Sequence, residues 1–191
     1  MRHLTLTLTL TLTLTLIGRL LRDENDKVLE VAQGPLLQAI IALSSQNGKM
    51  IQEVASALLT WTEASCKEFG GDPSIYPVVV SCLQAFETSL PHIYTEIIRT
   101  APWAEASSTE EALSSRFDSF MESGEELSWS AWEWLMAAVP RLMAMAPVRI
   151  GGPNRLIGQA LARVFRGINN TMGLTYTRDV LQPNFALILS S

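Results

Sequence analysis

Three arginines at helical spacing are the residues of this chain best suited to bind a ligand or partner. Arg155, Arg163 and Arg166 fall on one side of an α-helix expected over residues 155–168, and this stretch contains no acidic residue. The opposite half of the helix is apolar and consists of Leu156, Ile157, Ala160, Leu161, Val164, Phe165 and Ile168. The planar guanidinium group of arginine forms paired hydrogen bonds with phosphate or carboxylate. We therefore expect an anion-binding face made of Arg155, Arg163 and Arg166, together with Arg149.

Four kinds of partner could bind these guanidinium groups. They can pair with carboxylates of the chain itself, contact nucleic-acid phosphates, lie on the headgroups of a membrane surface, or bind a partner protein. The net charge of −5 is unusual for a free protein that holds nucleic acid on its own. A subunit of an assembly avoids this objection, because only the surface that faces the nucleic acid has to be basic.

Charge is distributed along the chain in three blocks. Residues 1–22 carry three arginines and no acid, residues 23–140 carry a net charge of −13, and residues 141–191 carry +5. This segregation indicates that the basic end either meets an anionic partner or docks on the acidic middle of its own or a neighbouring copy.

The sequence lacks the residue patterns of common catalytic and cofactor sites. Its only imidazoles, His3 and His92, and its only thiols, Cys66 and Cys82, do not have the spacing of a zinc motif. No nucleophile elbow, P-loop or dinucleotide-binding glycine motif is present. Cys66 lies on the apolar face of an expected helix, so we expect a buried, unreactive thiol. We therefore predict a protein that is not an enzyme, with no metal, no cofactor and no small-molecule ligand.

The first 22 residues form a separate segment with an unusual repeat. Leucine occupies every even position from Leu4 to Leu16, and threonine occupies every odd position from Thr5 to Thr15. As a β-strand this alternation gives one all-leucine face and one all-threonine face, whereas as a helix it scatters the leucines. Threonine also favours strands. The sequence therefore predicts an extended, strand-like arm.

An exposed apolar strand of this length aggregates unless it is paired, buried, inserted or removed. We expect the arm to add to a neighbouring copy or to pair within the chain. The predicted oligomer contacts are Leu4, Leu6, Leu8, Leu10, Leu12, Leu14 and Leu16, joined by Trp134 from the body of the protein. The other interpretations are a cleaved organelle presequence, a membrane segment or secretory signal, and an extension without function.

Beyond the arm, apolar residues recur every three to four positions, which is typical of α-helices. Glycine and proline pairs such as Gly34-Pro35 and Gly70-Gly71 separate the expected elements. We predict a mainly α protein: a single-domain bundle of about six helices over residues 23–169, with the extended arm over residues 1–22 and a short extended tail over residues 170–191.

These features predict a self-associating structural subunit of the coat, filament or nucleoprotein type, placed inside a cell or in a virion-like assembly. Its expected partners are copies of itself, with nucleic acid as a candidate for the arginine face. The alternative is a helical accessory protein that is imported into mitochondria or another organelle, or is associated with a membrane. In that case residues 1–22 would be an address or an anchor.

Overall fold

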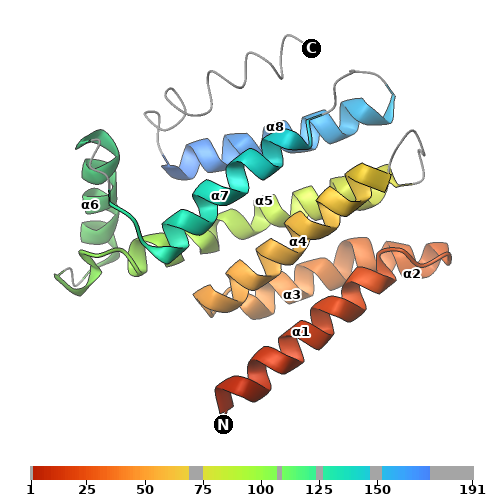
Figure 1. Ribbon diagram of the computed structural model, residues 1–191, viewed down its shortest axis with the longest axis horizontal. Helices are drawn as coiled ribbons and strands as arrows, with labels where there is room; N and C mark the ends of the chain where they lie inside the picture. Colours follow the sequence, from red (N-terminus) through yellow and green to blue (C-terminus); the bar gives the residue numbers. More distant parts are fainter. Residues whose placement is uncertain (1, 69–74, 107–108, 124–126, 147–151, 173–191) are drawn as a thin grey trace. The chain divides into compact units, whose positions relative to one another are not determined.

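A computed structural model describes residues 2–68, 75–106, 109–123, 127–146 and 152–172 of the 191-residue chain. All regular elements within these ranges are helical, which confirms the predicted mainly α bundle (Figure 1). They are α1 (Arg2–Leu20), α2 (Asp26–Val31), the π-helical segment η1 (Ala32–Leu36), α3 (Leu37–Ser44), α4 (Gly48–Glu68), α5 (Tyr76–Arg99), the 3₁₀ turn η2 (Ala104–Ala106), α6 (Glu110–Ser123), α7 (Ser130–Ala144) and α8 (Pro153–Met172). The chain divides into two compact units, Met1–Ser89 and Leu90–Ser191, with the boundary inside α5.

The predicted extended arm is wrong, because residues Arg2–Leu20 form helix α1. The side chains of Leu10, Ile17 and Leu21 are buried, and that of Leu14 is half-buried. These positions are four, three and four residues apart and therefore share one helix face. The strict alternation ends at Ile17, and this change of period supplies the apolar stripe that the repeat alone lacks.

The threonines of α1 are also compatible with a helix. Thr13 donates its hydroxyl hydrogen to the Thr9 carbonyl oxygen at 2.8 Å, and Thr15 does the same to Thr11 at 2.8 Å. Each hydroxyl is therefore satisfied by the preceding turn of the helix, so the intrinsic strand preference of threonine is overridden by packing along α1.

Helix α1 packs against η1 and α4 in the first unit. The crossing with α4 occurs at Gly18, where an added Cβ would lie 2.7 Å from Nε1 and 3.0 Å from Cε2 of Trp61. Only glycine permits this approach without a shift of the Trp61 ring or of one helix. The arm is thus a structural element of the first unit.

The expected break at Gly34-Pro35 is a change of winding within a continuous helical run. Helix α2, η1 and α3 follow one another without a gap, and Pro35 lies inside the π-helical segment. Proline cannot donate the usual backbone hydrogen bond, and a wider turn is one way for a helix to accommodate it. The first unit is completed by α4 and the first half of α5, which bury Ile51, Val54, Leu58, Leu59, Val79, Leu83 and Phe86.

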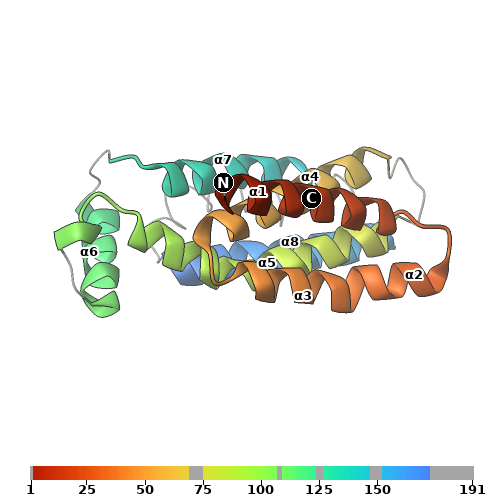
Figure 2. The same cartoon turned by 90° about the horizontal axis from the view of Figure 1, so that it is seen from below.

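The second unit contains the end of α5 and helices α6, α7 and α8. Helix α6 runs at a steep angle to α7 in both views (Figures 1 and 2). Aromatic rings connect α5, α6 and α7, and the Trp129 indole N–H donates a hydrogen bond to the Ile97 carbonyl oxygen at 2.9 Å. Of the predicted tail over residues 170–191, residues 170–172 belong to α8, and the remainder lies outside the described residues.

Candidate anion-binding surface

Helix α8 carries the predicted arginine face, and its start is set by local chemistry. Gly152 has a φ of 51°, in the left-handed region that favours glycine, and Pro153 is the first helical residue, a position where a missing N–H costs nothing. The helix buries Ile157, Ala160, Leu161, Val164, Phe165 and Ile168. The predicted apolar half is therefore confirmed except at Leu156, which is 42% exposed.

The three predicted arginines of α8 are exposed and share one stripe of the helix. At 100° per residue, Arg155, Arg163 and Arg166 fall within an arc of about 80°, and exposed Gln159 lies between them. With a rise of 1.5 Å per residue, the stripe is about 16 Å long. It presents three positive charges and no acid, since α8 contains no aspartate or glutamate. The fourth predicted residue, Arg149, lies outside the described residues.

Among the described residues, the arginines of this stripe make no ion pair or hydrogen bond through their guanidinium groups, in contrast to Arg99. The guanidinium group of Arg99 donates from Nη2 and Nε to Glu96 Oε2 at 2.6 Å and 3.0 Å. The interpretation in which the α8 arginines pair with the chain's own carboxylates therefore has no support in the described part of the chain. Three solvated guanidinium groups along one edge can bind an extended anion or several separate anionic groups.

The predicted oligomer contacts are distributed over buried and exposed positions. Leu12 and Leu16 are exposed on α1, whereas Leu10 is buried within the chain and Leu14 is half-buried. The side chains of Leu4, Leu6 and Leu8 lie outside the described residues. Trp134 is half-buried and already interacts within its own chain. Because α1 is a helix, contact by addition of a β-strand is wrong for this segment. Of the predicted contact leucines whose side chains the structure describes, Leu12 and Leu16 are exposed.

The two thiols lie in the first unit and are poor nucleophiles. Burial and the nearby Glu63 carboxylate raise the pKa of Cys66 from 9.0 to about 11. Burial raises the pKa of Cys82 from 9.0 to about 12, although its hydrogen bond with Thr62 acts in the opposite direction. At neutral pH both groups are almost entirely protonated, and the thiol is far less nucleophilic than the thiolate. The raised pKa of Cys66 fits the expected unreactive thiol, but its side chain is half-buried and not buried as expected.

Sequence reasoning missed two pockets, because each combines residues from separate segments. One lies in the first unit, has a volume of about 500 Å³ and places the acids Asp23 and Asp26 beside apolar Leu21, Leu29 and Val78. The other lies in the second unit beside Trp103 and is treated below. Within the described ranges, no three His, Cys, Asp or Glu side chains gather as metal ligands would.

None of the helices in the described part of the chain combines the length and the apolar character needed to cross a membrane.

Comparison with known protein families, curated proteins and solved structures gives no match.

Proposed function

We propose that this protein is a non-enzymatic, self-associating structural subunit that holds an anionic partner on the arginine stripe of α8. The observation that carries the proposal is the stripe itself. Arg155, Arg163 and Arg166 are exposed on an acid-free helix and have no carboxylate partner among the described residues. Its buried opposite face fixes the helix in place, so the arginines project from a rigid support.

Nucleic-acid phosphate is the anion that best suits this stripe. Arginine binds phosphate through two parallel hydrogen bonds, and about 16 Å of helix spans several phosphate groups of a single strand. Three contacts from a protein with a net charge of −5 give weak binding. Self-association overcomes this weakness because many copies on one nucleic acid add their contacts. A second anionic surface that could receive the stripe is the acidic block of a neighbouring copy, residues 23–140.

Exposed apolar side chains in the first unit support self-association. Leu43 on α3 is 75% exposed, and Leu12 and Leu16 on α1 are 63% and 56% exposed. Large apolar residues that are left in water favour contact between copies when they are covered in an assembly. Helical contacts of this kind replace the strand pairing expected from the leucine and threonine repeat.

The test compares the full chain with two triple variants of equal charge. One variant carries Arg155→Gln, Arg163→Gln and Arg166→Gln. The matched control carries Arg19→Gln, Lys27→Gln and Lys49→Gln, which removes three exposed cations of the first unit. Each protein is analysed by size exclusion with light scattering and with absorbance at 260 and 280 nm.

We expect the wild type and the control to elute as particles larger than the 21.0 kDa chain with an elevated 260 nm signal. The stripe variant should lose the 260 nm signal. If the stripe instead meets the acidic block of a neighbour, the wild type has no 260 nm signal and the stripe variant alone becomes smaller. Identical size and absorbance for all three proteins would refute the proposed role of the stripe.

A second candidate is a helical accessory protein addressed to an organelle by residues 1–22. The observation that favours it is the helical state of Arg2–Leu20 together with its arginines and its lack of acids, which are features of import sequences. The burial of Ile17 and Leu21 in the first unit favours the structural role instead. Fusion of residues 1–22 to a fluorescent reporter separates the two, because an address carries the reporter into an organelle and a structural helix leaves it in the cytosol.

A further inference from the structure

Two rings of an aromatic cluster, Trp103 and Phe120, line a pocket in the second unit. Six rings lie within centroid distances of 5.3 to 6.1 Å of their neighbours. They belong to Tyr94, Trp103, Phe117, Phe120, Trp129 and Trp132. Trp103 packs on Phe120 at 5.4 Å and on Trp129 at 5.3 Å, so its indole is fixed from two sides.

The indole N–H of Trp103 is a buried donor without an acceptor. Its Nε1 atom is inaccessible to solvent and has no hydrogen-bond partner among the described residues. The neighbouring Trp129 is different, because its Nε1 donates to the Ile97 carbonyl oxygen. A buried donor that lacks an acceptor is costly and uncommon in folded proteins. The Trp103 N–H is therefore a polar group that the described part of the chain leaves unsatisfied.

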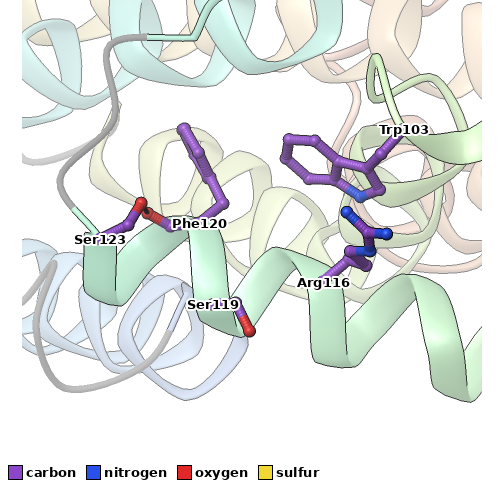
Figure 3. A pocket seen from close by; sticks show the side chains of 5 residues that line it. All are labelled: Trp103, Arg116, Ser119, Phe120 and Ser123. Atoms are coloured by element: carbon purple, nitrogen blue, oxygen red, sulfur yellow. Dashed lines mark hydrogen bonds between the residues drawn. The ribbon is translucent and has the colours of Figure 1, made fainter.

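The pocket beside this N–H has a volume of about 200 Å³ and is lined by Trp103, Arg116, Ser119, Phe120 and Ser123 (Figure 3). In this view the indole nitrogen lies on the side of the ring that is turned toward the Arg116 guanidinium. Arg116 has no ion pair or hydrogen bond through that group among the described residues. Both groups only donate hydrogen bonds, so neither can satisfy the other. Because Nε1 of Trp103 has no accessible surface, an anionic oxygen accepts from both groups only when the exposed Arg116 side chain turns away from the indole.

The charges of α6 are arranged to leave this pocket free of acid. Arg116, Ser119, Phe120 and Ser123 fall on one face of the helix. The four acids of α6 all lie about 120° or more around the helix from Arg116, and they are Glu110, Glu111, Asp118 and Glu122. The positive charge of Arg116 therefore faces the pocket without a carboxylate on the same side of α6.

We propose that this pocket binds a small aromatic carboxylate, with the carboxylate between the Trp103 N–H and the Arg116 guanidinium and the ring against Phe120 and Trp103. The volume supports a ligand of this size, because a cavity of about 150 Å³ is enough to hold benzene. The aromatic walls favour an apolar body over a bare ion. The planar fork of arginine matches the geometry of a carboxylate. This site is separate from the arginine stripe of α8 and does not depend on it.

The test is calorimetric titration of the full chain with benzoate, accompanied by tryptophan fluorescence. We expect saturable binding in the millimolar range, as is usual for a ligand with few atoms. Benzyl alcohol, which keeps the ring and lacks the charge, should bind more weakly, and so should inorganic phosphate, which keeps the charge and lacks the ring. Phosphate that binds as well as benzoate would overturn the assignment of an aromatic ligand, and no binding of benzoate would overturn the site.

Two variants and one control assign the binding to the named groups. Arg116→Gln should weaken benzoate binding by about tenfold or more, because it removes a charge-assisted hydrogen bond at an exposed residue. Trp103→Phe keeps an aromatic ring and removes the N–H, and it should weaken the binding of benzoate by a larger factor than the binding of benzyl alcohol. Lys67→Gln removes an exposed cation of the first unit and should have no effect. Equal loss in Lys67→Gln and Arg116→Gln would indicate a nonspecific charge effect and would overturn the proposal.

Discussion

Replacement of Gly18 by alanine tests whether α1 is a packed part of the first unit. The new Cβ would lie 2.7 Å from Nε1 and 3.0 Å from Cε2 of Trp61, whereas nonbonded carbons are most stable at about 3.5–4.0 Å. Either α1 or the Trp61 indole must move by several tenths of an ångström or more. Such overpacking costs about 1–3 kcal/mol, and alanine returns about 0.5–1 kcal/mol through its higher helix propensity. We expect a net loss of roughly 0.5–2 kcal/mol in the free energy of unfolding.

Gly34→Ala is the matched control for this substitution. Gly34 also lies in a helical segment, but an added Cβ there would meet no atom within 4 Å outside its chain neighbours and its own helix backbone. Alanine usually stabilises such a site by about 0.4–1 kcal/mol. Gly34 precedes Pro35, however, and the proline ring crowds a helical residue that carries a Cβ, so we expect little net change in the control. Urea unfolding followed by far-UV circular dichroism measures both variants. The difference in stability between the two variants separates the clash with Trp61 from the general effect of replacing glycine.

A double-mutant cycle assigns the loss to Trp61. Trp61→Phe removes the part of the indole that carries Nε1, so Gly18→Ala should cost less in that background than in the wild type. A Gly18→Ala variant that is as stable as Gly34→Ala would refute the packing of α1 against α4 at Gly18.

Three further predictions concern the core, the thiols and the exposed leucines. Phe117→Ala should lower the free energy of unfolding by about 3–5 kcal/mol in urea titrations, because Phe117 is fully buried at the centre of the ring cluster. Because the pKa of Cys66 is raised from 9.0 to about 11, the folded state binds more protons than the unfolded state above pH 9. The contribution of Cys66 to the stability of the folded state is therefore retained below pH 9 and lost as the pH rises through about 11. Cys66→Ser should reduce this loss, as measured by thermal unfolding at several pH values. Leu12→Gln with Leu16→Gln should lower the scattering mass at unchanged unfolding temperature, and a full-sized particle would argue against contact through α1.

The two faces of helix α8 were predictable because the spacing of its residues along the sequence defines them. Seven apolar residues at helical spacing define one face, and only Leu156 departs from the expected burial. The arginines could be placed on the opposite face for the same reason. The absence of carboxylate partners for these arginines among the described residues could not be predicted, since it depends on which surfaces the fold brings near α8.

Helix α1 was not predictable from its local pattern. The leucine and threonine alternation favours a strand, and no single residue within it indicates a helix. The decisive features lie outside the repeat, in Ile17, Gly18 and Leu21, and in the contact of Gly18 with Trp61. Tertiary packing therefore overrides local propensity. The Trp103 pocket could not be predicted either, because Arg116 lies on α6 and Trp103 lies in the segment before α6, and only the fold brings them together.

The central claim is that the arginine stripe of α8 binds phosphate, and the salt dependence of binding tests it most directly. Fluorescence anisotropy with a labelled single-stranded oligonucleotide gives the observed affinity at several salt concentrations. Three released counterions correspond to a slope of about −2 in a plot of log affinity against log salt. We predict that the wild type has a slope steeper by about 2 than the variant carrying Arg155→Gln, Arg163→Gln and Arg166→Gln. Equal slopes for the two proteins would contradict the claim.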